Sequence, residues 1–150
     1  MLKDSSANAD RMKHALAAKR RRPALLLLNG WEFNCIPYLK AGYDGLLLGG
    51  GVFNGYLAGQ IVAAAAAGEW GRAKRFQLRM NRMMWDVYGG KKIACWLSGE
   101  KYLLMCMGIF RTWKNYPGYS LSSACRRAIE RTIRRDAEWL FGDQEQAGST

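Results

Sequence analysis

ALLLLNG, residues 24–30, decides the fold of this chain together with GLLLGGG, residues 45–51. Each stretch is a short apolar run that ends in glycine and leads into a segment with helical character. Apolar runs without polar alternation are typical of strands buried on both faces of a parallel sheet. Glu32 to Ala41 lies between them and is about the shortest segment that can carry a crossover helix. The sequence therefore predicts βα units, which bind ligands at the carboxyl ends of their strands.

The length and charge of the chain narrow the possible functions. At 150 residues the chain can form one domain with a sizeable core, but a complete (β/α)8 barrel typically needs about 250 residues. The 49% of hydrophobic residues excludes an intrinsically disordered protein. The net charge of +11 raises the possibility of a nucleic-acid partner. The basic segments 19–22 and 126–135 carry no known nucleic-acid-binding signature, so we expect a solvated basic surface and no such partner.

The sequence indicates a cytoplasmic protein without a membrane partner. Lys and Arg interrupt every long apolar stretch, so no run reaches the ~18 apolar residues that a membrane helix needs. The opening residues MLKDSS lack the apolar segment of a signal peptide. The four cysteines have no metal-ligand spacing, and we expect buried free thiols in a reducing compartment. They are Cys35, Cys95, Cys106 and Cys125.

The first residues, LKDSSAN at 2–8, resemble a motif of the dihydrodipicolinate synthase and N-acetylneuraminate lyase family. In that family a G-[LIM]-K-[DE]-[SA]-[ST]-G pattern ends the sixth strand and carries a Schiff-base lysine. The resemblance continues in register with LLNG at 27–30 and AGYDGLL at 41–47. Two departures stand out. Ala7 replaces the family's glycine, and the glycine run 49–51 replaces a small-polar segment that ends in Asn.

The resemblance implies the C-terminal half of a (β/α)8 TIM barrel followed by a helical bundle, a helix-dominated α/β fold. Residues 1–68 would form the partial barrel, from the end of strand 6 to helix 8. Residues 69–142 would form the C-terminal helical region, and 143–150 a disordered tail. Apolar spacing and capping residues predict helices at 8–19, 34–40, 52–67, 69–88 and 97–110, and a last helix that Ser120 caps and that runs to residue 141.

The resemblance also assigns the site. Lys3 would attack the 2-oxo group of pyruvate or a longer 2-oxo acid, without a metal or organic cofactor. Gly30, Trp31 and Glu32 would face the distal end of the substrate, and the carbonyl of Leu47 would lie beside the lysine.

Alternatives remain for these residues. On composition alone, an ordinary exposed lysine near the N-terminus is the favoured interpretation of Lys3, and the family resemblance reverses that preference. Glu32 can either bind a sugar-acid hydroxyl or open the helix that follows it. The glycine run 49–51 and the helix after it offer backbone N–H groups to an anion, although this is weak evidence for nucleotide binding.

The family takes its proton-shuttling tyrosine and its carboxylate-binding, Thr-rich loop from strands that precede the lysine. We therefore expect this chain to be truncated and inactive on its own as a lyase or aldolase. The alternative is a non-catalytic α-rich domain that self-associates through its open half-barrel face. In either case we expect a homo-oligomer.

Overall fold

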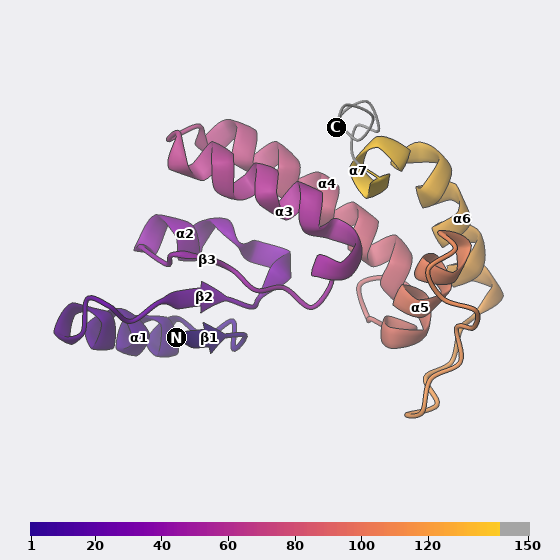
Figure 1. The fold of residues 1–150 in the computed structure, drawn as a ribbon, viewed down its shortest axis with the longest axis horizontal. Coiled ribbons are helices and arrows are strands. Elements are labelled where there is room, and N and C mark those ends of the chain that lie inside the picture. Colours follow the sequence, from indigo (N-terminus) through magenta and orange to yellow (C-terminus); the bar gives the residue numbers. More distant parts are fainter. Residues whose placement is uncertain (142–150) are drawn as a thin grey trace, which may run out of the picture. The chain divides into compact units, whose positions relative to one another are not determined.

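The computed structural model of the chain describes residues 1–141. Its internal contacts divide the chain into two compact units, Met1–Asn81 and Arg82–Thr150, called unit 1 and unit 2 below. Figure 1 shows the order of the elements along the chain. The domain boundary expected at residue 68 stays a prediction, and the expected tail 143–150 lies outside the described residues.

Unit 1 contains a parallel three-stranded sheet in the order β1-β2-β3, with β1 at Leu2–Asp4, β2 at Leu27–Asn29 and β3 at Gly45–Leu46. Lys3 lies opposite Leu28, which lies opposite Gly45. The α/β class and the parallel sheet are confirmed. Both apolar runs form shorter strands than expected. Ahead of β2, the Leu25 N–H donates to the Arg22 carbonyl at 2.8 Å, so the chain is still turning there.

Unit 1 connects its strands through helices. They are α1 (Ala9–Arg21), the short 3-10 helix η1 (Glu32–Asn34), α2 (Ile36–Ala41), α3 (Gly51–Ala66) and the first part of α4 (Trp70–Tyr88). Asn8 caps α1, since its side chain accepts from the Asp10 and Arg11 N–H groups at 2.9 and 3.0 Å. The crossover from β2 to β3 is divided into η1 and α2. Pro37, in the first turn of α2, has no N–H with which to continue a helix from η1.

The two faces of the sheet have different surroundings. Leu27 is fully buried against Ala15 of α1 and against Tyr38 and Tyr43, which form one core cluster with it. Successive residues of a strand point to opposite faces. Lys3 and Leu28 therefore share the other face of the sheet. On the same face, Leu26 before β2 and Leu47 after β3 are 51% and 43% exposed. One face thus packs on helices, and the other is apolar and open among the described residues.

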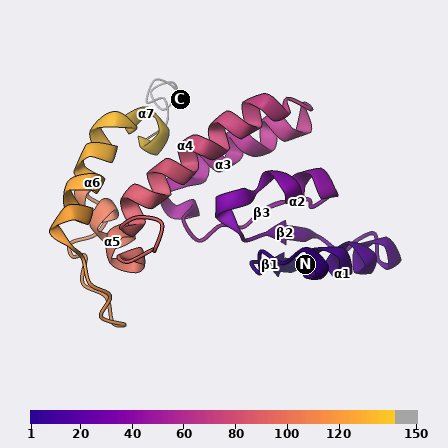
Figure 2. The same cartoon turned by 180° about the vertical axis from the view of Figure 1, so that it is seen from behind.

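A helical hairpin follows the sheet. The chain turns at Gly68, whose φ of +73° is easily adopted only by glycine, and α4 then runs back beside α3 (Figures 1 and 2). The ends predicted for these two helices agree with the structure to within one residue. At the far end of α4, Gly89 and Gly90 also have positive φ and terminate the helix as expected.

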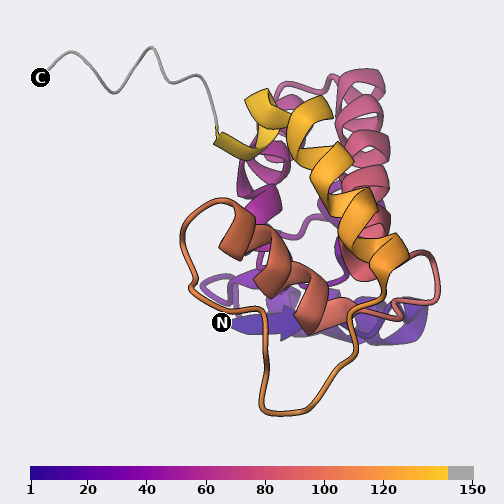
Figure 3. The same cartoon turned by 90° about the vertical axis from the view of Figure 1, so that its right-hand side faces the viewer.

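Unit 2 is helical, with α5 at Trp96–Cys106, α6 at Ser123–Arg135 and α7 at Ala137–Phe141. Figure 3 shows the long loop that joins α5 to α6. The prediction of one last helix capped by Ser120 is wrong in two respects. Ser122 is the cap, with its Oγ accepting from the Cys125 N–H at 3.1 Å, and the helix breaks at Asp136.

Two further expectations for unit 2 need correction. The helix predicted to reach residue 110 ends at Cys106, because the chain turns at Gly108 with a φ of +79°. Cys106 is exposed in this last turn, whereas Cys35, Cys95 and Cys125 are the buried free thiols that were expected. None of the described helices is both long and apolar enough to cross a membrane.

Candidate active site

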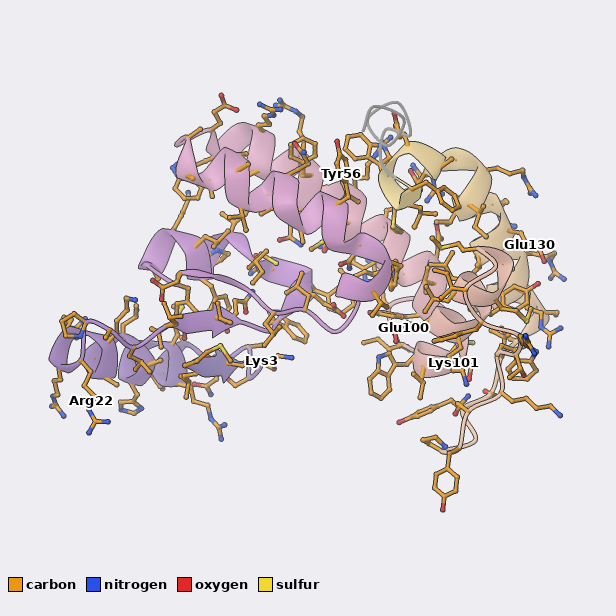
Figure 4. All side chains as sticks on the ribbon, viewed as in Figure 1. Lys3, Arg22, Tyr56, Glu100, Lys101 and Glu130 are labelled. Atoms are coloured by element: carbon orange, nitrogen blue, oxygen red, sulfur yellow. The ribbon has the colours of Figure 1, made fainter. Side chains whose placement is uncertain are left out.

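Lys3 lies on the open face of the sheet, at the middle position of β1. Its side chain is exposed. Figure 4 shows it reaching out at the end of unit 1 opposite Arg22, which is the end where the parallel strands finish. β1 is held in place at both ends, since the Leu2 N–H donates to the Leu26 carbonyl at 2.8 Å and the Gly30 N–H to the Asp4 carbonyl at 2.7 Å. The lysine is thus an exposed side chain on a strand that is hydrogen-bonded at both ends.

Gly30 leaves the space that the Lys3 side chain occupies. A Cβ at position 30 would lie 2.4 Å from Lys3 Cε and 2.1 Å from Ser5 Oγ, far inside van der Waals contact. Any other residue at position 30 would therefore push the lysine aside. The structure brings these two predicted site residues together, and it adds Ser5 as their neighbour.

Asp4 anchors the strand end from the opposite, buried face. Its carboxylate accepts from the Ser6 N–H and Oγ–H at 2.9 and 2.6 Å, and from the Tyr43 hydroxyl at 3.0 Å. Burial alone would raise the pKa of Asp4, but the hydrogen bonds from Ser6 and Tyr43 outweigh it, so the pKa is lowered. Burial and the bond to Asp4 raise the pKa of Tyr43. The two residues form an Asp4 carboxylate–Tyr43 phenol pair.

Ala7 takes the left-handed conformation, with a φ of +53°. This is the position at which the family resemblance expects glycine, and glycine adopts this conformation without steric cost. Ala7 therefore adopts, at some steric cost, a conformation that favours glycine.

Glu32 is 9% exposed, and its side chain contacts the second βα loop. Its Oε2 accepts from the Gly50 N–H at 2.7 Å, directly before α3. The carboxylate thus lies at the positive end of α3, the position that the sequence offered to an external anion. Glu32 also opens η1, as one of its two sequence-based interpretations expected.

The backbone around Glu32 is held by two side chains from α4. The Gln77 amide donates to the Glu32 carbonyl at 2.9 Å and accepts from the Cys35 N–H at 2.8 Å. Asn81 donates to the Phe33 carbonyl at 2.9 Å. Sequence reasoning missed this clamp. Its only signal was the pair of amides, four residues apart, in a stripe otherwise rich in Met and aromatic residues.

Trp31 and Leu47 are the remaining predicted site residues. Trp31 is half-buried and packs against the core cluster of α1 and α2, with its ring 5.5 Å from that of Phe33. Its N–H donates to Asn29 Oδ1 at 2.8 Å. Leu47 is exposed on the open face, and its N–H donates to the Asn29 carbonyl at 2.9 Å. The fully buried Asn29 therefore ties together the segments that carry both residues.

Asp44, in the AGYDG motif, has a structural use. Its carboxylate accepts from Lys19 Nζ at 2.6 Å and from the Leu27 N–H at 2.7 Å, which joins the end of α1 to the start of β2. The hydrogen bond from Lys19 is the main reason why the pKa of Asp44 is lowered. Sequence reasoning used this motif only for register and did not foresee these contacts.

The described residues contain no group of three or more His, Cys, Asp or Glu side chains that could hold a metal ion. The nearest thiol to the two loops, Cys35, is unsuited to act as a nucleophile, since burial and the neighbouring Glu32 raise its pKa to about 12. Lys3, in contrast, is an exposed amine on the open, apolar face of the sheet.

Solved structures with the same arrangement identify the fold. A dihydrodipicolinate synthase from Bacteroides thetaiotaomicron is 23% identical, with a TM-score of 0.75 over 89% of this chain and 45% of the synthase. An N-acetylneuraminate lyase from Fusobacterium nucleatum, complexed with pyruvate, is 16% identical, with a TM-score of 0.73 over 89% of this chain and 43% of the lyase. A variant of the Sulfolobus solfataricus 2-keto-3-deoxygluconate aldolase is 16% identical, with a TM-score of 0.68 over 93% of this chain and 47% of the aldolase.

All three enzymes belong to the dihydrodipicolinate synthase family. The chain has the fold of part of that family's barrel. The resemblance inferred from LKDSS and AGYDG is thereby confirmed at the level of the fold. No protein-family model and no curated protein matches the sequence. The chain spans less than half the length of these solved relatives.

Proposed function

We propose that this chain carries the Schiff-base lysine of a lyase or aldolase that acts on 2-oxo acids, with Lys3 as the nucleophile. The observation that carries the proposal is the position of Lys3. It lies on the open, apolar sheet face, one residue before the carboxyl end of β1, and its side chain occupies the space that Gly30 leaves. Parallel βα folds bind their ligands at this end of the strands.

The chemistry follows from a neutral lysine amine and a ketone. Lys3 Nζ adds to C2 of the 2-oxo acid, and loss of water gives an iminium ion. The iminium then draws electrons from the neighbouring carbon. When the bond between C3 and C4 breaks, its electron pair forms the enamine, and the C4 hydroxyl gives up its proton as the aldehyde leaves. Protonation of C3 and hydrolysis of the iminium return the 2-oxo acid and the free lysine.

The other predicted residues have proposed roles at the distal end of the substrate. Glu32 and Gly30 follow β2 directly, and Leu47 follows β3 on the same open face as Lys3. A substrate bound as an imine at Lys3 would extend toward these two loops. Glu32 Oε2 already accepts a hydrogen bond from the Gly50 N–H. We therefore propose that Glu32 fixes the loop between β3 and α3 in addition to any contact with the substrate.

Exchange of the pyruvate methyl protons in D2O tests the proposal without an aldehyde partner. Enamine formation removes a C3 proton, and reprotonation from solvent then introduces deuterium. We expect the wild-type chain and a Lys13→Arg control, in which an exposed α1 lysine is replaced, to exchange the methyl group. Lys3→Arg should not exceed the rate in buffer, and equal exchange by Lys3→Arg and wild type would overturn the proposal.

Self-association of a non-catalytic domain is the competing proposal. It is favoured by the exposed apolar residues of the open sheet face, Leu26 and Leu47. Imine chemistry distinguishes the two, because only the first proposal requires pyruvate methyl exchange that depends on Lys3.

A further inference from the structure

The loop of residues 107–122, between α5 and α6, is the longest segment without a helix or strand among residues 1–141. It extends beyond the helices of unit 2 in Figures 1 and 3. Connections of this length are uncommon in compact domains, and ordered ones usually have a function. Side chains hold this loop in place. The Asn115 amide donates to Ser98 Oγ at 2.8 Å and accepts from the Tyr119 N–H at 3.0 Å, and the Ser98 hydroxyl donates to the Tyr119 carbonyl.

Aromatic side chains recur at every third position of this loop, at Phe110, Trp113, Tyr116 and Tyr119. Trp113 is half-buried, and the other three are exposed, Tyr116 fully. Trp96 of α5 is also exposed and packs edge-on against Tyr119, with ring centroids 5.5 Å apart. Folded chains seldom expose several large rings in one segment without a binding role. The loop is therefore a candidate binding surface.

Exposed cations are interleaved with these rings. Arg111 and Lys114 directly follow the first two aromatic positions of the loop, and both are exposed. Residues 89–122 contain a single acidic residue, Glu100, and its side chain is buried at 8% exposure. The surface of the loop thus combines aromatic rings with positive charge that no accessible carboxylate of this segment neutralises.

This combination fits an unpaired nucleic-acid strand better than a membrane surface. Every base presents a flat π face that can stack on an aromatic ring, and the cations can neutralise the phosphates. Cations also lie over the rings themselves. Lys101 Nζ lies 5.8 Å from the centroid of the Phe110 ring, and the Arg126 guanidinium lies 5.0 Å from that of the Trp113 ring. Rings that entered a lipid bilayer would have to leave these cations or carry them into hydrocarbon, which is costly.

We propose that the loop 107–122, together with Trp96 and Lys101 of α5, binds single-stranded nucleic acid by base stacking and phosphate contacts. The expectation of no nucleic-acid partner rests on the basic segments 19–22 and 126–135, and this loop lies outside both. The proposal does not depend on imine chemistry, because the loop belongs to unit 2 and Lys3 to unit 1. DNA and RNA share the unpaired base and the phosphodiester, so both are used as probes.

Fluorescence anisotropy tests the proposal with the full chain and labelled oligothymidylate or oligouridylate of about 15 nucleotides. Tyr116 is the residue to change, because its full exposure means that the fold does not depend on its ring. Tyr116→Ala removes the ring, and Tyr116→Trp keeps a flat ring. Tyr56→Ala is the matched control, because it removes an exposed ring from α3, outside the loop. Circular dichroism reports that each variant remains helical.

We expect the chain to bind the oligonucleotides, with roughly tenfold weaker binding by Tyr116→Ala. Tyr116→Trp and Tyr56→Ala should bind as wild type does, and a duplex of the same length should bind more weakly. The affinity should fall as the salt concentration rises. Arg111→Gln should lower the slope of log affinity against log salt by about 0.7, the value for one phosphate of a single strand.

Three results would overturn the proposal. They are no binding of either oligonucleotide at low salt, equal affinity of Tyr116→Ala and wild type, and a duplex bound as tightly as the single strands. The second and third would leave an ordinary basic surface. Sedimentation of the chain with phosphatidylserine vesicles, without oligonucleotide binding, would also overturn it and would identify an anionic membrane as the partner.

Discussion

At the scale of single residues, the site depends on the absence of a side chain at Gly30. The space beside β2 is filled by the Lys3 side chain, and the closest approaches are to flexible atoms, Lys3 Cε and Ser5 Oγ. A larger residue at position 30 would move these side chains without disturbing the backbone. Gly30 is therefore expected to matter more for the direction of the lysine than for the stability of unit 1.

Gly30→Ala tests this separation. We expect the free energy of unfolding to change by about 1 kcal/mol or less, since side chains can give way. The yield of the borohydride-reduced pyruvate adduct at Lys3 should fall several-fold, while the yield at Lys13 stays the same and serves as an internal control. Equal adduct yields at Lys3 in the variant and the wild type would show that Gly30 does not direct the lysine.

The contact between Tyr43 and Asp4 also belongs to this scale. Tyr43→Phe removes a buried donor from a carboxylate, and we expect a loss of about 1–2 kcal/mol of stability at neutral pH. The folded pKa of Asp4 lies below its ordinary value of 3.8. This contribution is therefore complete above that value and disappears as the pH falls below it, toward the folded pKa.

Denaturant unfolding of wild type and Tyr43→Phe across the acid range provides the measurement. The difference between the two should be constant from about pH 5 to 8 and should shrink below about pH 4. Tyr116→Phe is the control, because Tyr116 is fully exposed. A difference that grows as the pH falls would contradict the role assigned to the Asp4 carboxylate.

At the scale of elements, Gly99 sets how close α5 comes to the end of α4 within unit 2. A Cβ at position 99 would lie 1.8 Å from the Val87 carbonyl oxygen, which is a backbone atom and cannot move aside at low cost. The Cys125 thiol of α6 also contacts this oxygen, at 3.4 Å. The arrangement of these helices therefore requires glycine at position 99.

Gly99→Ala should destabilise unit 2 by about 3 kcal/mol. Gly71→Ala is the matched control, and it should be neutral or stabilise the chain by up to about 1 kcal/mol, because that helical position is open. Thermal and urea unfolding measure both. A Gly99→Ala variant as stable as Gly71→Ala would mean that α5 and α4 are not packed as described.

Capping residues and glycines in the sequence correctly predicted the ends of helices that depend on neighbouring residues alone. α1 begins at its Asn8 cap, and α3 and α4 end at glycines with positive φ. Contacts distant in sequence controlled the rest. The last helix breaks at Asp136, where Arg135 contacts both that residue and Asp86, 2.9 Å away on α4. Periodicity cannot detect such a contact, and it equally missed the Gln77 clamp on η1.

At the scale of the whole molecule, the predicted class was correct because the motifs occur in the right order. LKDSS and LLNG contain β1 and β2, and AGYDG leads into β3, the third of the adjacent parallel strands. The site is less predictable than the fold. The sequence assigned Lys3 and Gly30 to one site but not to neighbouring positions, and the surroundings of Glu32 depend on Gly50 and α4.

The chain spans less than half of its solved relatives, and one face of its sheet is apolar and open among the described residues. We propose that Lys3 acts on this face. The central claim is that Lys3 forms the imine.

Reductive trapping tests that claim most directly. The chain is incubated with pyruvate and borohydride, digested, and mapped by mass spectrometry at every lysine. The account predicts that Lys3 carries the dominant adduct. A dominant adduct on another lysine with Lys3 unmodified, or adducts spread evenly over the exposed lysines, would contradict it.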